Sequence, residues 1–139
     1  MYIPHGKFKV ALYRLRGTKI GQNVDISSMV FLDEAYPEFI TIQDNVDIGP
    51  GTYIVVHDSS LRCIQKDLPL SVSKVCIEEN VYIGTSVVIL PGVTIGKNSI
   101  IAAGSVVTRD IPPNSVAAGD PARIISTLDE YKAKHNLRP

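Results

Sequence analysis

The sequence of 139 residues has no tryptophan, three phenylalanines, two cysteines and three histidines. Its core therefore has to be built mainly from aliphatic side chains. Basic and acidic residues balance at 14 each, so no net charge favours nucleic acid or an anionic membrane as a partner. No apolar run approaches the roughly 20 residues of a membrane span, and the N-terminus lacks a signal-peptide core. We therefore expect a cytoplasmic protein of one domain.

The few cysteines and histidines also bear on metal and redox chemistry. Cys63 and Cys76 flank the one long break in the repeat described below, and we expect both to be reduced in the cytosol. His5, His57 and His135 lie far apart in the sequence, without a cysteine at a typical metal-ligand spacing. We therefore expect no built-in metal site.

A six-residue repeat dominates the sequence between Ile77 and Pro112. The segments IEENVY, IGTSVV, ILPGVT, IGKNSI, IAAGSV and VTRDIP each begin with Ile or Val. Neither the period of a helix nor that of a half-exposed strand produces this spacing. A sixfold repeat is typical of a parallel β-helix, in which each segment forms a short strand and a corner, and stacked coils bury one another's apolar faces.

The same register extends towards the N-terminus and divides the chain into about four coils. Every leading position of the repeat holds Ile, Leu or Val. The first corner of each coil holds asparagine, which adopts positive φ more readily than most residues. The coils span residues 20–37, 42–59, 77–94 and 95–112, and the corner residues are Asn23, Asn45, Asn80 and Asn98. The sequence thus predicts an all-β, three-sided prism.

Short helices are expected at both ends of the prism. Residues 4–16 place Phe8, Leu12 and Leu15 on one helical face, which we expect to cover the exposed edge of the first coil. A lid over a binding pocket is the alternative role of this helix. Thr127 and Glu130 have the spacing of a capping box. The predicted organisation is an N-terminal helical cap (1–17), a prism (18–125) and a C-terminal helix (126–139).

The repeat is interrupted at two places. Extra residues around Pro37 separate the first two coils, and residues 60–76 leave the prism after the second. Long excursions from compact folds are commonly functional. His57 stands at the start of this excursion, at a corner, and is expected to point outwards. Asp58 occupies a place that normally faces inwards, so either the chain has already turned outwards or the carboxylate is paired.

The segment from Ile77 to Ile125, with the motifs IGTSVV, IAAGSVVTRD and GDPARII, closely resembles sugar and serine O-acetyltransferases of the hexapeptide-repeat acyltransferase superfamily. The resemblance covers about residues 17 to 125 and implies a left-handed β-helix. It also implies a homotrimer that binds acetyl-CoA in a groove between two subunits and transfers the acetyl group to a sugar hydroxyl. A place in polysaccharide biosynthesis is the pathway that this resemblance suggests.

The resemblance assigns the chemistry to one histidine. In this family a histidine acts as general base on the acceptor hydroxyl, which attacks the thioester directly, without an acyl-enzyme. His57 is the residue that matches this base, and imidazole suits the task because it titrates near neutral pH. Asp33, Glu34 and Asp58 are the carboxylates that we expect near His57, and we predict that they contact the acceptor.

Cofactor contacts follow from the matching motifs. Thr85 and Ala103 occupy equivalent places one coil apart, where the family contacts the pantetheine arm. Thr108, Arg109 and Arg123 match positions that meet the adenosine phosphates, and arginine offers several donors to phosphate oxygens.

Three alternatives to sugar O-acetylation stay open. N-acetylation of an amino sugar needs nearly the same base chemistry. A serine acetyltransferase-like enzyme is less favoured, because the large N-terminal helical domain usual in those enzymes is missing. A non-catalytic β-helix scaffold would have no need for His57, the long excursion and the GSVVTRD segment together.

Overall fold

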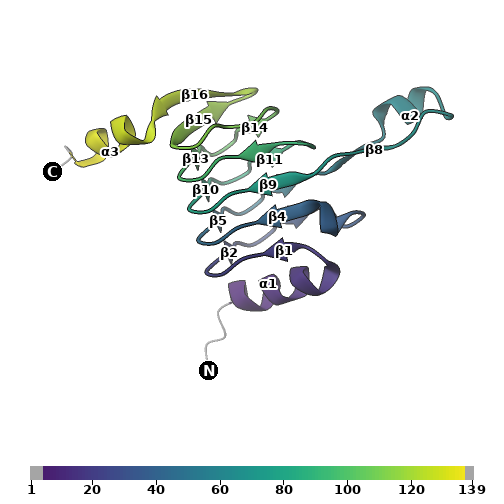
Figure 1. The fold of residues 1–139 in the computed structure, drawn as a ribbon, viewed down its shortest axis with the longest axis horizontal. Coiled ribbons are helices and arrows are strands. Elements are labelled where there is room, and N and C mark those ends of the chain that lie inside the picture. The colour runs from purple at the N-terminus through teal and green to yellow at the C-terminus, as the bar shows by residue number, and fades with distance from the viewer. Residues whose placement is uncertain (1–4, 137–139) are drawn as a thin grey trace.

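The computed structural model of the protein describes residues 5–136. Strands of two or three residues alternate with tight corners and wind into a prism of stacked coils (Figure 1). Three sheets form its faces, here called A, B and C, and their strands are parallel except for β16 at the end of face B. Face A contains β1 (Lys19–Ile20), β4 (Ile40–Ile42), β9 (Val75–Ile77) and β12 (Thr94–Ile95). Face B contains β2 (Asp25–Ile26), β5 (Asp47–Ile48), β10 (Tyr82–Ile83), β13 (Ile100–Ile101), β15 (Ser115–Gly119) and β16 (Ala122–Thr127). Face C contains β3 (Phe31–Leu32), β6 (Tyr53–Ile54), β11 (Val88–Ile89) and β14 (Val106–Val107).

The leading aliphatic residues of the repeat stack inside the prism. On face B the register pairs Ile26 with Ile48, Ile48 with Ile83, and Ile83 with Ile101. All four side chains are at most 1% exposed. Each buried isoleucine contributes on the order of 1.5–3 kcal/mol to stability, so this ladder holds the coils together in place of aromatic residues. The predicted parallel β-helix is confirmed.

The asparagine corners between faces A and B are also confirmed. Asn23, Asn45, Asn80 and Asn98 have φ between 55° and 57°. Their side-chain amides donate along the column to the next carbonyl oxygen, at 2.9 to 3.2 Å. The last acceptor is Asn114, which also has positive φ and which the sequence pattern did not include.

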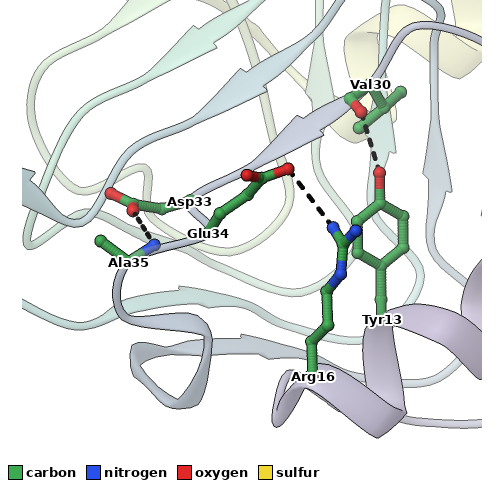
Figure 2. Close-up of polar contacts among 6 residues, drawn as sticks. All are labelled: Tyr13, Arg16, Val30, Asp33, Glu34 and Ala35. Atoms are coloured by element: carbon green, nitrogen blue, oxygen red, sulfur yellow. Dashed lines mark hydrogen bonds and ion pairs between the residues drawn. The ribbon is translucent and has the colours of Figure 1, made fainter.

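The predicted N-terminal helix is present as α1 (His5–Arg16), but its predicted packing face is wrong. The three residues expected to face the prism are exposed, namely Phe8, Leu12 and Leu15. Val10 is buried instead, and Tyr13 packs against the core and donates its hydroxyl to the Val30 carbonyl at 2.9 Å (Figure 2).

The reason lies in a different spacing on the same helix. Gly6, Val10 and Tyr13 share one helical face, and a Cβ at Gly6 would lie 2.7 Å from Asp25 Oδ1. The atom it would meet is the end of the Asp25 side chain, so Gly6 permits this approach without dictating it. The burial of Val10 and the hydrogen bond from Tyr13 to Val30 hold this face against the first coil.

Residues 57–74 form a structured arm. β7 (His57–Asp58) pairs antiparallel with β8 (Ser71–Val72), and α2 (Ser60–Ile64) lies at the tip, away from the prism (Figure 1). Asp58 is exposed and accepts a hydrogen bond from the Ser60 N–H at 2.8 Å, so the chain has already turned outwards there. Cys63 and Cys76 are both free thiols.

The C-terminal segment adds a hairpin and a helix. β15 extends face B in parallel, and β16 folds back against it. The predicted capping box is confirmed at the start of α3 (Leu128–Asn136): Thr127 N–H donates to Glu130 Oε2, and Glu130 N–H donates to Thr127 Oγ1, both at 3.1 Å. Within residues 5–136, no helix combines the length and apolar character that crossing a membrane requires.

Candidate functional site

The three columns of corners differ in content. The AB corner, between faces A and B, carries the asparagines described above. The BC corner follows β10 and β13 and carries Thr85 and Ala103. The CA corner follows the strands of face C and carries His57. Because β6 pairs with β11 and β11 with β14, Thr108 lies two coils above Val55, on the same corner as His57.

His57 contacts a buried carboxylate. Its Nδ1 lies 2.5 Å from Asp33 Oδ2, and the two side chains are 35% and 1% exposed. Asp33 follows β3, one coil below Val55, because Leu32 pairs with Ile54. Its Oδ2 also accepts the Val56 N–H, and its Oδ1 accepts the Ala35 N–H, both at 3.0 Å (Figure 2 shows the second). Backbone groups from two coils therefore hold this carboxylate in place.

The environment of Asp33 keeps it ionised. Burial alone raises the pKa of this carboxyl, but hydrogen bonds from Val56, the His57 ring and Ala35 outweigh that effect and hold the pKa below its ordinary value. A carboxylate only accepts hydrogen bonds, so His57 Nδ1 has to donate. In the neutral imidazole this leaves Nε2 with its lone pair, the arrangement that a general base requires.

The other two predicted carboxylates bind elsewhere. Glu34 points towards α1 and pairs with Arg16 at 3.4 Å, with both side chains more than half exposed (Figure 2). The pKa of the exposed Asp58 carboxyl is lowered chiefly by hydrogen bonds from Ser60. Of the three predicted acceptor contacts, Asp33 is the one whose carboxylate bonds to His57, and both of its oxygens are used within the chain.

An aromatic ring lies beside the imidazole. The Tyr36 and His57 ring centroids are 5.7 Å apart, with the planes inclined at 59°. Tyr36 immediately precedes η1 (Pro37–Phe39), a short helix in the insertion between the first two coils. This contact was not predicted from the sequence. The signal that could have indicated it is an aromatic residue, Tyr36, next to an insertion in the repeat.

The residues predicted to bind the cofactor lie in two groups. Thr85 and Ala103 are exposed on neighbouring coils of the BC corner. The coils approach so closely there that a Cβ at Gly84 would lie 2.7 Å from the Ala103 nitrogen. Thr108 and Arg109 are exposed on the CA corner, at the other edge of face C.

Arg123 completes the predicted set on β16, where it pairs with Ala118 across the terminal hairpin and is exposed. One chain does not bring the two corner groups together, because face C separates them.

The two main surface hollows of the chain do not include the His57–Asp33 pair. Two surface hollows of about 570 and 750 Å³ lie beside α1, and neither is lined by His57. In the part of the chain that the structure describes, no group of three or more His, Cys, Asp or Glu side chains is arranged to hold a metal ion.

Comparison with known proteins points to one family. The family model for "Bacterial transferase hexapeptide (six repeats)" matches residues 77–109. Galactoside O-acetyltransferase of Escherichia coli is 46% identical over 97 residues, covering 69% of this chain and 47% of that protein. The putative acetyltransferase YvoF of Bacillus subtilis is 35% identical over 135 residues, covering 96% of this chain and 74% of that one. The chain spans about half the length of the Escherichia coli galactoside O-acetyltransferase and of several other curated relatives.

Solved structures show the same likeness. A galactoside acetyltransferase in complex with coenzyme A superposes with a TM-score of 0.72 at 32% identity, covering 96% of this chain and 76% of that one. A maltose O-acetyltransferase from Clostridium difficile 630 gives a TM-score of 0.67 at 31% identity, covering 91% of this chain and 78% of that one.

Proposed function

Because the chain belongs to the hexapeptide-repeat acetyltransferases, we propose that it is an acetyl-CoA-dependent O-acetyltransferase that acts on a sugar hydroxyl. The observation that carries this proposal is the His57–Asp33 pair, which leaves Nε2 available as a base at a half-exposed corner. Relatives named for galactoside and maltose favour a sugar as the acceptor. The left-handed winding, four complete coils, a cytoplasmic location and a role in polysaccharide biosynthesis belong to the same proposal.

In the proposed reaction His57 moves one proton. Acetyl-CoA supplies the acetyl group as a thioester. His57 Nε2 accepts the hydroxyl proton of the sugar while the sugar oxygen attacks the thioester carbonyl carbon, so that a C–O bond forms and the C–S bond breaks. The imidazolium then returns the proton to the departing thiolate, which leaves as the free thiol of coenzyme A. Asp33 stabilises the transient positive charge on the ring.

The chain's own residues fit the extended co-substrate. The BC corner offers small side chains, Thr85 and Ala103, at closely spaced coils, so a slender pantetheine arm has room along them. Exposed guanidinium groups at Arg109 and Arg123 are available for the phosphates. Thr108 adds a hydroxyl donor beside Arg109.

The site as proposed needs a second copy of the chain. His57 and Arg109 lie on one edge of face C, and Thr85 and Ala103 lie on the other. If the CA corner of one chain meets the BC corner of the next, both groups line a single groove, and a closed ring such as a homotrimer repeats that contact.

The outward surface of face C suits such a contact. Phe31 and Tyr53 stack with ring centroids 5.5 Å apart and are 37% and 49% exposed. Val88 and Val106 continue the column in register. An apolar strip of this kind on a β-prism is typical of a surface that another chain covers.

The test is thiol release from acetyl-CoA with a panel of galactosides, maltose, amino sugars and serine. His57→Ala is compared with His135→Ala, which removes an exposed histidine from α3. We expect sugar-dependent release that falls by about 100-fold or more in His57→Ala, with acetyl-CoA binding retained and His135→Ala unchanged. Preference for amino sugars or serine would redirect the acceptor assignment. Unchanged turnover in His57→Ala would contradict the proposal.

A further inference from the structure

The contact between Tyr36 and His57 comes from a segment that the repeat does not require. The register of the prism is interrupted after the first coil and resumes at Ile42 in β4. The inserted residues form η1, immediately after Tyr36, and place its ring 5.7 Å from the imidazole. The insertion therefore brings an aromatic ring into contact with the proposed base.

The hydrogen bond to Asp33 holds the imidazole at one atom. Asp33 is immobilised because its two oxygens accept the Ala35 and Val56 N–H groups. A ring bound at Nδ1 alone can still swing about that contact, and the swing carries Nε2 along an arc. Displacements of about 1 Å in a reacting group cost on the order of 100-fold in rate. A second contact with the ring removes this freedom.

Tyr36 is itself held by the prism. The Phe39 ring packs edge-on against it, with centroids 6.1 Å apart and planes at 81°. The Phe39 N–H donates to the Tyr36 carbonyl at 3.0 Å and closes the turn, and Pro37 restricts φ at its start. Both aromatic residues pack against the buried core. The position of the Tyr36 ring is therefore independent of the arm that begins at His57.

We propose that Tyr36 is a positioning residue, whose ring acts with Asp33 to fix the His57 imidazole so that Nε2 faces the acceptor hydroxyl. This inference rests on the proposed function. It assigns the insertion between the first two coils a task in the reaction and distinguishes two restraints: Asp33 sets the proton on Nδ1, and Tyr36 sets the direction of the ring. The aromatic ring carries the effect, and the phenolic hydroxyl is dispensable.

The kinetic test compares Tyr36→Phe, Tyr36→Leu and Tyr36→Met. The matched control is Tyr131→Leu, because Tyr131 makes the chain's other described tyrosine–histidine ring contact, with His135 at 4.1 Å in α3. We expect kcat to fall about 10- to 100-fold in the Leu and Met variants, with the KM for acetyl-CoA within about twofold of the parent. Tyr36→Phe is expected to retain kcat within about threefold, and Tyr131→Leu to match the parent.

A second readout does not depend on catalysis. The His57 Cε1–H signal in a ¹H–¹³C NMR spectrum, assigned by its loss in His57→Gln, senses the neighbouring aromatic ring and the mobility of the imidazole. We expect one sharp signal in the parent and Tyr36→Phe, and a shifted and broadened signal in the Leu and Met variants.

The outcomes separate the two proposals. A parent protein that transfers acetyl to no acceptor would refute the proposed function, while the NMR comparison would still decide whether Tyr36 orders the ring. If the parent is active, a folded Tyr36→Leu or Tyr36→Met variant that keeps both the parental kcat and the parental His57 signal would overturn the inference. So would a Tyr36→Phe variant as impaired as Tyr36→Leu, because the hydroxyl would then carry the effect.

Discussion

Two corner columns of the same prism, AB and CA, differ in how regular their residues are. The AB corner repeats one residue with one backbone conformation, and each asparagine amide bonds to the next, from Asn23 to Asn114. The CA corner holds a different residue in each coil, namely Ala35, His57, Gly92 and Asp110, and it also carries η1 and the arm. The first edge stabilises the stack and the second carries the proposed chemistry. In a repetitive fold, departures from the repeat mark the residues to test for function.

The largest loss of activity is expected at the CA corner, from a change to the buried carboxylate of Asp33. Asp33→Asn removes the carboxylate that fixes the His57 tautomer and stabilises the imidazolium, so we expect kcat to fall by about 100-fold or more. Glu34→Gln is the control, since that side chain points to Arg16, and it should leave kcat within about twofold. Steady-state thiol release measures both, and equal losses in the two variants would contradict the role of Asp33.

A substitution in the asparagine column of the AB corner should lower stability and leave activity unchanged. Asn80→Ala places alanine at a φ of 57° and breaks two hydrogen bonds of the column, to Asn45 and Asn98. We expect a loss of about 2 kcal/mol in the free energy of unfolding, with kcat unchanged. Asn80→Gly relieves the backbone strain and should lose about half as much. Urea denaturation measures both. A change in kcat without a change in stability would contradict the claim that the AB corner stabilises the stack and takes no part in the reaction.

The smallest effect concerns the acidic pair on face B. Partial desolvation by its neighbours on face B, and then the charge of Asp25, raise the pKa of Asp47, so its ionised form disfavours the folded state. Asp47→Asn should therefore raise stability at pH 7, by less than about 1 kcal/mol because the side chain is exposed. The gain should shrink as pH falls through the raised pKa, where Asp47 takes up a proton anyway.

Thermal melting between pH 3.5 and 8, with Asp67→Asn on the arm as control, checks this dependence. A gain that persists in full at the lowest pH would show that charge is not its cause.

What the sequence predicted follows the same division. The ladder of isoleucines, the asparagine corners and the capping box depend on short, repeated spacings, so they were predictable from the residues alone. The face of α1 was mistaken because packing there depends on the fit of Val10 and on the hydrogen bond from Tyr13 to the Val30 carbonyl, neither of which the count of apolar residues reports.

At the candidate site, His57 was found through the family motif and its place at the start of the arm. Asp33 and Glu34 are adjacent and chemically alike, and only the backbone N–H groups of Ala35 and Val56 decide which of them turns towards the histidine. The Tyr36 contact depends on the geometry of an inserted turn, which no repeat describes.

The central proposal is that one active site takes its base, His57, from one chain and the proposed pantetheine contacts, Thr85 and Ala103, from the next. Mixing His57→Ala with Ala103→Trp tests it directly, because each variant damages a different edge of face C. We predict that each variant alone is inactive. In trimers co-assembled at random from equal amounts, about three quarters are mixed and each of these retains one intact site of three, so the mixture should recover about a quarter of parental activity. Mixtures as inactive as the separate variants, with co-assembly demonstrated by mass, would contradict a shared site.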